Sequence, residues 1–340
     1  MKDGTMRAAV LSAPGKPLEI ANVDIPQPGP GQILIRLEAS GVCHTDVHVW
    51  RGDVMPVVWP EPFILGHEGV GIVAAIGPDV EGWSTGDRAG AAWIHDTCGQ
   101  CAECHDGEES FCQSHRAHGF NVPGTFAEYV VADARFAARL PASGKASALA
   151  PLMCAGLTAY GALRRAELVK GETCVIFGCG GLGLYAVQLA TRAGARVIAV
   201  DTSDEKLATA AAFGAWRTLK ASSKLANRWD VADQANVCIN FAPTSATWDM
   251  MIAAIRPRGR IVAAAMVSQP VDLNQEWLTG NGVKITGTSV GTRAQMAELI
   301  ALHQQDPFAA DVTEIALEDV TRALENLDRG SAKGRYCVVL

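Results

Sequence analysis

Four cysteines lie close together in the sequence and could bind a metal ion. Two residues separate Cys98 from Cys101 and Cys101 from Cys104, and Cys112 follows after seven more. Four thiolates on one short loop suit a tetrahedral zinc ion with every position filled, which is typical of a structural site. An iron–sulfur cluster is disfavoured, because bacterial ferredoxin motifs place the fourth cysteine three residues on and follow it with proline. Here Gln113 follows the last cysteine.

Other potential metal ligands are dispersed. Cys43 is followed by Asp46, His67 precedes Glu68, and Cys154 stands alone. Each by itself says little, because a lone cysteine behaves as a small buried hydrophobe and a lone histidine is usually packed in the protein. Two thiolates and one imidazole together can hold a catalytic zinc ion and leave its fourth position open.

A glycine-rich loop indicates dinucleotide binding. Gly178, Gly180 and Gly183 follow a short apolar run and precede a helical pattern. They suit a tight turn, close approach of backbone to a pyrophosphate, and close packing of helix on strand. Asp201 ends the next predicted strand, and an acid there binds ribose hydroxyls and repels a 2′-phosphate, so it favours NAD over NADP. The alternative is a structural turn with Asp201 as a helix cap.

Composition limits the class of protein. The chain has 340 residues, enough for two domains, and 49% hydrophobic and 19% charged residues indicate a folded globular protein. The net charge of −7 argues against a nucleic-acid or anionic-membrane binder. The N-terminal residues lack a secretory pattern, and no apolar run approaches the roughly 18 residues of a membrane span. We therefore expect a cytoplasmic protein, where disulfides are rare and clustered cysteines more often bind metal.

Hydrophobic patterns predict two domains. Up to about residue 154, short β-branched runs bounded by Gly and Pro predict an irregular β domain. Beyond it, apolar strands alternate with helices, which is typical of a parallel sheet covered on both faces. The predicted strands are 174–177, 196–200, 237–241, 260–265 and 283–286, and the helices are 157–166 and 182–193. The last residues, with helices 293–303 and 317–327 and strand 335–340, are expected to return to the first domain.

Over essentially its whole length the chain resembles the zinc-dependent, medium-chain alcohol dehydrogenases, most closely the tetrameric bacterial and yeast enzymes. Two cysteines and one histidine are also the catalytic zinc ligands of alcohol dehydrogenases. The resemblance rests on residues 41–48, 65–71, 154–160 and 289–293, the four-cysteine loop, and the glycine loop with Asp201. It implies a two-domain α/β fold. A GroES-like, irregular β catalytic domain (1–154 and 289–340) would carry both zinc sites, and a Rossmann doubly wound parallel sheet (155–288) would bind NAD.

The resemblance also implies individual roles for the site residues. Cys43, His67 and Cys154 would bind the catalytic zinc, and Cys98, Cys101, Cys104 and Cys112 the structural zinc. Asp46 would orient His67, with Glu68 behind the metal. Thr45 would hydrogen-bond the alcohol oxygen, and the proton would pass through the cofactor ribose to His48 near the surface.

The implied cofactor contacts involve both domains. His44 and Arg335 would bind the pyrophosphate, Lys206 the ribose, and Thr158 and Val290 the nicotinamide, with Gly178, Gly180, Gly181, Leu182 and Gly183 forming the loop. His44, Lys206 and Arg335 could instead be ordinary surface charges.

Trp50 and Trp93 match positions where yeast-type enzymes narrow the pocket for short primary alcohols, although either could be a core aromatic. The segments 53–60 and 263–268 depart from the family pattern, which leaves the substrate preference open.

The sequence thus predicts an NAD-dependent alcohol dehydrogenase with two zinc ions per chain. It would interconvert short- or medium-chain primary or secondary alcohols with aldehydes or ketones, as a cytoplasmic homotetramer without nucleic-acid or membrane partners. The alternatives are a zinc dehydrogenase for polyols, hydroxy acids or aryl alcohols, and a catalytically silent nucleotide-binding or crystallin-like protein. Polyol enzymes commonly have glutamate at the Cys154 position, aryl-alcohol relatives usually lack the acid at Asp201, and silent relatives often lose zinc ligands.

Overall fold

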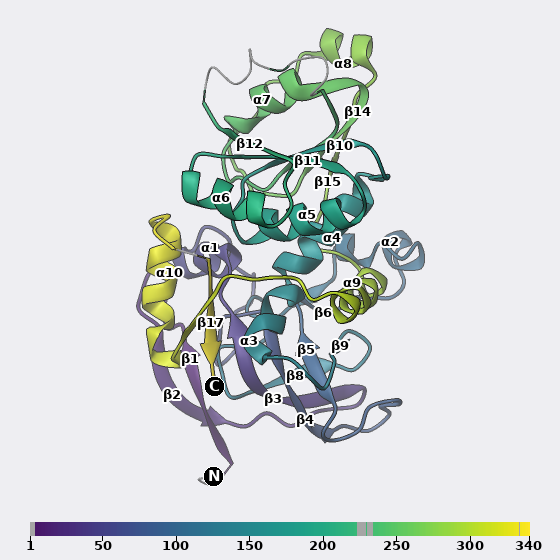
Figure 1. Cartoon of the computed structure of the whole chain (residues 1–340). Helices are drawn as coiled ribbons and strands as arrows, with labels where there is room; N and C mark the ends of the chain where they lie inside the picture. Colours follow the sequence, from purple (N-terminus) through teal and green to yellow (C-terminus); the bar gives the residue numbers. More distant parts are fainter. Residues whose placement is uncertain (1–3, 223–228, 230–233, 333) are drawn as a thin grey trace. The chain divides into compact units, whose positions relative to one another are not determined.

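A computed structural model describes residues 4–222, 229, 234–332 and 334–340, and the chain divides into two compact units (Figure 1). Unit 1 comprises Met1–Cys154 and Thr292–Leu340, and unit 2 comprises Ala155–Gly291. The return to unit 1 lies three residues after the expected position 289. The reason is local: Thr292 is the N-cap of helix α9 (Arg293–Gln305), and its hydroxyl accepts from the Gln295 amide at 3.3 Å, so the cap belongs with its helix.

Unit 2 contains a six-stranded parallel sheet in the order β12-β11-β10-β13-β14-β15, which is the Rossmann order. Figure 1 shows α5 and α6 on one side of the sheet and α7 and α8 on the other, and every residue of β10 is buried. The doubly wound sheet predicted from the sequence is confirmed. Its elements are α4 (Ala155–Arg165), β10 (Thr173–Phe177), α5 (Gly181–Arg192), β11 (Arg196–Asp201), α6 (Asp204–Ala212), β12 (Arg217–Lys220), β13 (Ala235–Asn240), α7 (Thr247–Ala254), β14 (Ile255–Ala263), α8 (Gln275–Asn281) and β15 (Lys284–Gly287).

Unit 1 is mainly antiparallel β-structure with short helices. A seven-stranded sheet has the path β16-β17-β3-β4-β5-β9, with β8 paired to β3, and two small sheets pair β1 with β2 and β6 with β7. The strands are β1 (Thr5–Val10), β2 (Glu19–Asp24), β3 (Gln32–Gly41), β4 (Gly69–Ile76), β5 (Arg88–Ala91), β6 (Ile94–Asp96), β7 (Arg116–Ala117), β8 (Tyr129–Asp133), β9 (Ala138–Arg139), β16 (Val312–Ile315) and β17 (Arg335–Val339). The α-helices are α1 (His44–Arg51), α2 (Ala102–His105), α3 (Ala146–Leu149), α9 and α10 (Val320–Asp328), and the 3₁₀ helices are η1 (Glu109–Phe111), η2 (Ala150–Met153) and η5 (Leu317–Asp319).

The C-terminal segment returns to unit 1, as expected, and adds strands β16 and β17 to its large sheet. Strand β17 pairs antiparallel with β3 and parallel with β16. Helix α10 buries Val320, Ala323, Leu324 and Leu327 on one helical face, and Val320, Leu324 and Leu327 join the core that contains Phe126 and Ile64. The last turns of the chain are therefore integral to the unit that contains the cysteine clusters.

One predicted strand was misplaced. The apolar run 260–265 predicted a strand, but β14 starts earlier, at Ile255, and stops at Ala263. Its first half carries exposed Arg256 and Arg258, so hydrophobicity gave no signal for it. Its end is set by the neighbouring strand, because the amides of Ala264 and Ala265 both donate to the Asn240 carbonyl at 3.0 Å and turn the chain out of the sheet.

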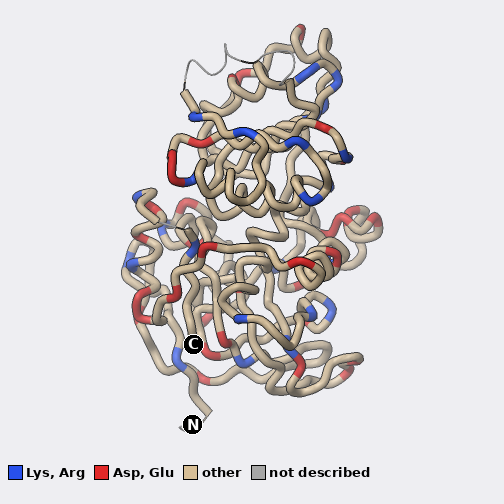
Figure 2. The backbone as a smooth tube through the Cα atoms, in the orientation of Figure 1, with Lys and Arg blue, Asp and Glu red and all other residues tan. Residues whose placement is uncertain are grey.

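Charges are dispersed over the described chain. Figure 2 shows acidic and basic residues interspersed along the backbone of both units. Among the described residues, no single helix is long and apolar enough to span a membrane. One bent pair of helices, Ala146–Met153 with Ala155–Arg165, has sufficient length and apolar composition when the two are taken together, and length and composition are the only support for a span there.

Two glycines of unit 2 should differ in their effect on stability. A Cβ on Gly183 would lie 1.8 Å from the Gly178 carbonyl oxygen, whereas a Cβ on Gly180 would have nothing within 4 Å. We expect Gly183→Ala to lower the free energy of unfolding by about 1–3 kcal/mol, because backbone must move. Gly180→Ala, the matched control, should be neutral or slightly stabilising. Thermal unfolding midpoints measure the difference, and equal midpoints for the two variants would contradict the packing described.

Candidate metal and cofactor sites

The dispersed metal ligands predicted from the sequence come together in unit 1. Ligand atoms of Cys43, His67, Glu68 and Cys154 all lie within 4.8 Å of one another, and all four residues are buried. Cys43 precedes α1, His67 and Glu68 precede β4, and Cys154 follows η2. We call these four residues the buried cluster. Three separate segments therefore converge on one point inside the same unit.

Asp46 holds two of these segments in place. Its Oδ2 accepts from the Cys43 amide at 2.8 Å, and its Oδ1 accepts from His67 Nδ1 at 3.0 Å and from the Gly66 amide at 3.1 Å. A carboxylate only accepts, so Nδ1 carries the proton and the lone pair of the neutral ring lies on Nε2. His67 Nε2 is buried and has no hydrogen-bond partner among the described residues.

The geometry of the buried cluster fits zinc. An orphaned imidazole nitrogen in a protein interior is costly unless something binds it. The Cys43 and Cys154 sulfurs lie 3.9 Å apart, close to the roughly 3.8 Å between two ligands of tetrahedral zinc with Zn–S bonds of about 2.3 Å. All ten cysteines lie in the described part of the chain and are free. Two thiols and an imidazole therefore converge with the spacing that zinc requires.

The charges around the buried cluster favour one thiolate. The hydrogen bond from Cys154 lowers the pKa of Cys43 well below its usual value, against the effect of burial and with further help from His67. The same hydrogen bond, together with burial, raises the pKa of Cys154. Burial lowers the pKa of His67, but the Asp46 carboxylate and Cys43 together raise it well above its ordinary value. Metal binding must displace protons from these groups, so the affinity for zinc should decrease as the pH is lowered.

Glu68 forms a buried ion pair that sequence reasoning missed. The Arg335 guanidinium binds both Glu68 carboxylate oxygens, at 2.6 Å to Oε2, and donates to the Val42 carbonyl at 3.4 Å. Burial nevertheless raises the pKa of Glu68 to about 7, with Arg335 opposing the shift. A Cβ on Gly41 would lie 1.9 Å from Glu68 Oε2, so the carboxylate occupies the space that a side chain would need.

This pairing bears on the role expected for Arg335. The resemblance implied a contact with the cofactor pyrophosphate, but in unit 1 the Arg335 side chain is only 8% exposed and is engaged by Glu68. The two residues are 267 positions apart in the sequence, and no spacing pattern could have paired them.

The four-cysteine loop also assembles. The ligand atoms of Cys98, Cys101, Cys104 and Cys112 lie within 4.8 Å of one another, with Cys98 Sγ 3.9 Å from Cys104 Sγ and 3.5 Å from Cys112 Sγ. Backbone amides, that of Gln100 first, lower the pKa of Cys98 to about 6. A thiolate ready at neutral pH and sulfur spacings near those of tetrahedral zinc suit the closed site predicted from the spacing.

Glu109, inside this loop, is another residue that sequence reasoning missed. Its carboxylate is buried and its Oε1 accepts from the Arg293 amide at 2.8 Å and from Arg293 Nε at 3.2 Å. An acid at the first amide of α9 interacts favourably with the helix N-terminus. The loop thereby fixes the start of α9, where the chain re-enters unit 1.

The expected relay residues lie on α1. Thr45 is partly exposed, with its hydroxyl 3.9 Å from Cys43 Sγ, and His44 is exposed at the first helical position. His48 Nδ1 lies 3.1 Å from Asp53 Oδ2, and the His48 side chain is 32% exposed. Because Asp53 accepts a hydrogen bond from Nδ1, the proton of neutral His48 lies on Nδ1, and Nε2 is the basic nitrogen. Gly52, at φ 84°, ends α1 and turns Asp53 back toward His48.

The two tryptophans expected in the pocket have different surroundings. Trp50 is part of the hydrophobic core, and its indole N–H donates to the Lys16 carbonyl at 2.7 Å, which favours the structural interpretation. Trp93 is partly exposed and its ring meets the His67 ring edge-on, with centroids 5.1 Å apart. Only Trp93 therefore borders the buried cluster.

The glycine loop of unit 2 has the geometry of a phosphate-binding turn. Gly178 has φ 89°, Gly180 faces open space, and α5 begins at Gly181. The Asp201 carboxylate accepts from the Cys179 amide at 2.7 Å and from the Ser203 amide at 2.9 Å, so the loop itself orients the acid at the end of β11. Free amides at the start of α5 can bind an anion.

The remaining expected cofactor residues are also placed by the structure. Leu182 is partly exposed in the first turn of α5, Lys206 is exposed on α6, and Thr158 is buried in α4. Val290 has φ 42°, an uncommon conformation for a β-branched residue that is often found at functional sites.

The thiol of Cys179, which lies inside the glycine loop, is not open to oxidation or alkylation. It is fully buried, and burial raises its pKa to about 12. A protonated, inaccessible thiol does not react in this way.

Known proteins match the chain along its length. Residues 29–142 match the alcohol dehydrogenase GroES-like domain, and residues 181–305 match the zinc-binding dehydrogenase family. An alcohol dehydrogenase of Moraxella sp. (strain TAE123) is 38% identical over 342 residues, covering 98% of this chain and 99% of that protein.

Solved structures match as well. The cobalt- and zinc-bound thermostable alcohol dehydrogenase from Pyrobaculum aerophilum has a TM-score of 0.88 at 30% identity, covering 99% of this chain and 100% of that one. Acetophenone reductase from Geotrichum candidum in complex with NAD has a TM-score of 0.87 at 28% identity, covering 100% of this chain and 98% of that one.

Metal analysis can test the two clusters separately. Purified protein should contain about two zinc ions per chain, and Cys43→Ser should contain about one, because the buried cluster loses a thiolate while the four-cysteine loop is intact. Cys174→Ala, which alters an equally buried cysteine of β10, should retain both. Two zinc ions per chain in Cys43→Ser would show that the buried cluster is not a zinc site.

Proposed function

The chain belongs to the zinc-dependent, medium-chain alcohol dehydrogenases, and we propose that it oxidises short- and medium-chain primary and secondary alcohols reversibly to aldehydes and ketones, with NAD as hydride acceptor. The observation that carries the proposal is the buried His67 Nε2, which has no partner among the described residues and lies beside two free thiols. Such a donor set leaves one zinc position for the alcohol oxygen.

Two zinc ions per chain would be held by this protein. Cys43, His67 and Cys154 would bind the catalytic ion, and Cys98, Cys101, Cys104 and Cys112 the structural ion. Zinc at the first site, when bound, supplies a Lewis acid that lowers the pKa of the alcohol hydroxyl. Asp46 keeps the His67 proton on Nδ1, so that the ring is presented in the tautomer that binds metal.

NAD would be bound mainly by unit 2. The open face at Gly180 allows the pyrophosphate to approach the backbone of Gly181, Leu182 and Gly183, and Asp201, oriented by Cys179, would accept from the ribose hydroxyls. NAD, when bound, supplies the nicotinamide ring that accepts hydride. We propose further cofactor contacts from His44, Lys206, Thr158 and Val290. Arg335 is proposed as well, and it would bind the pyrophosphate while its guanidinium remains paired with Glu68.

The protein's own residues would move the proton. Thr45 would hydrogen-bond the alcohol oxygen, since its hydroxyl lies next to Cys43 Sγ. His48 would receive the proton at Nε2, because Nδ1 is engaged by Asp53, and would release it to solvent from its partly exposed position. Asp53 is then a positioning residue for the base.

We further propose a cytoplasmic homotetramer. Ten free cysteines, four of them in a loop that could otherwise form disulfides, suit a reducing compartment. The tetramer follows from the resemblance to the bacterial and yeast enzymes, and light scattering on the purified protein tests it.

The cofactor assignment can be tested by kinetics. The zinc-loaded enzyme should oxidise alcohols with NAD at a kcat/KM at least about tenfold above that with NADP, because Asp201 repels a 2′-phosphate. Asp201→Asn should reduce this preference about tenfold, equivalent to about 1.4 kcal/mol. Asp204→Asn, on the exposed start of α6, is the matched control and should leave the ratio unchanged. A wild-type enzyme that prefers NADP would refute the role of Asp201.

The relay can be tested at His48. His48→Gln should lower kcat near neutral pH by about tenfold or more, and added imidazole should restore part of it, because an external base replaces the missing one. Asp53→Asn, which keeps a hydrogen-bonding group beside His48, should have a smaller effect. A wild-type rate and pH profile in His48→Gln would exclude this histidine from proton transfer.

A further inference from the structure

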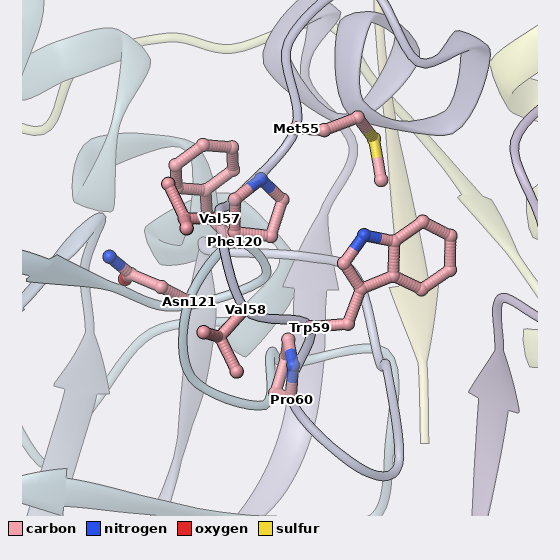
Figure 3. Close-up of a pocket in the computed structure, with 8 residues that line it drawn as sticks. Met55, Val57, Val58, Trp59, Pro60, Phe120 and Asn121 are labelled. Atoms are coloured by element: carbon pink, nitrogen blue, oxygen red, sulfur yellow. The ribbon is translucent and has the colours of Figure 1, made fainter.

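An apolar pocket lies in unit 1, in the segment that departs from the family pattern. Residues 55–60, together with Phe120 and Asn121, line a space of about 420 Å³ (Figure 3). This volume lies in the range of small-molecule sites, roughly 300–1,000 Å³. Figure 3 shows Met55 beside Trp59, with Val57 and Phe120 facing them across the pocket.

The pocket has little polar character. Its lining residues carry no charge, and the one lining amide, Asn121, uses its Oδ1 to accept from the Ala117 amide at 2.5 Å. Val57 is 103% exposed, Val58 76% and Trp59 36%. Neighbouring large apolar side chains left in water are unfavourable unless something covers them, and they commonly mark a binding site.

The walls of the pocket are anchored. Met55 and Phe120 pack against the hydrophobic core of unit 1, and the Trp59 ring lies 5.0 Å from the buried Phe63 ring. Proline at positions 56 and 60 restricts the backbone between them. A preformed apolar wall binds an apolar group at a low entropic cost.

Aromatic rings connect the pocket with the buried cluster. The Phe120 centroid lies 6.0 Å from that of Trp93, and the Trp93 centroid lies 5.1 Å from that of His67. These distances place the Phe120 ring within about 11 Å of a proposed zinc ligand. A molecule whose hydroxyl reaches the catalytic metal could therefore extend an apolar tail along these rings.

We infer that this pocket binds the apolar tail of the substrate, and that the enzyme prefers alcohols with a longer alkyl or an aryl-alkyl tail over ethanol. Trp59, Val57 and Phe120 are the specificity-determining residues. The inference rests on the proposed function, because it places the hydroxyl of the same molecule at the zinc site.

A graded series of alcohols tests it. With saturating NAD, kcat/KM should rise about threefold for each added methylene from ethanol through n-butanol to n-hexanol, about 80-fold in all, and phenethyl alcohol should resemble n-hexanol. Trp59→Ala should lower kcat/KM for n-hexanol at least about tenfold and that for ethanol less than about twofold.

Two further variants make the test independent of folding defects. Val57→Asp changes a fully exposed side chain, so the variant should fold normally. Its charge in the apolar pocket should lower kcat/KM for n-hexanol more than that for ethanol, as Trp59→Ala does. Trp216→Ala, at an exposed tryptophan of unit 2, is the matched control and should leave kcat/KM unchanged for both ethanol and n-hexanol.

The outcomes separate the two proposals. Equal kcat/KM for ethanol and n-hexanol, or an equal loss for all alcohols in Trp59→Ala and Val57→Asp, would overturn the inference while leaving the proposed function intact. A loss for all alcohols that accompanies a smaller oligomer in light scattering would show that the pocket lies at a subunit contact and would also overturn it. No NAD-dependent oxidation of any alcohol would refute the proposed function itself.

Discussion

The buried carboxylate of Asp46 is the interaction on which the site in unit 1 depends. It accepts from the backbone of Cys43, from the backbone of Gly66 and from the ring of His67, and so joins the start of α1 to the segment before β4. A buried carboxylate is costly unless its oxygens are hydrogen-bonded, and here both are. The same three bonds fix the tautomer of His67 and the place of Cys43 relative to it. The proposed binding of zinc and the proposed proton transfer from Thr45 to His48 would both depend on that placement.

Both candidate sites combine a buried acid with a glycine that leaves room for a close approach. In unit 1, Glu68 occupies the space beside Gly41, and in unit 2 Gly183 lies against the Gly178 carbonyl. Asp201, like Asp46, is oriented by a backbone amide of the loop it serves. Backbone hydrogen bonds therefore hold Asp46 and Asp201 in position before any ligand arrives, whereas the Arg335 side chain holds Glu68.

Much of this could be predicted from the sequence where the signal is local. The four cysteines and the glycine loop each lie within a short stretch, so spacing alone indicates their chemistry, and the fully apolar strands of unit 2 predict a parallel sheet. Cys43, His67 and Cys154 are dispersed, and only the resemblance joined them. Pairs made by tertiary folding gave no signal: Arg335 with Glu68, and Glu109 with the start of α9. Trp50 could be core or pocket from sequence alone, because an indole suits both.

We propose that Cys43 and His67, both held in place by Asp46, bind one zinc ion together with Cys154. Anomalous diffraction at the zinc edge from crystals of the zinc-loaded protein tests it most directly. We predict a peak about 2.3 Å from the sulfurs of Cys43 and Cys154 and about 2.0–2.1 Å from His67 Nε2, and a second peak inside the four-cysteine loop. A disulfide between Cys43 and Cys154, with no peak beside His67 Nε2, would contradict it.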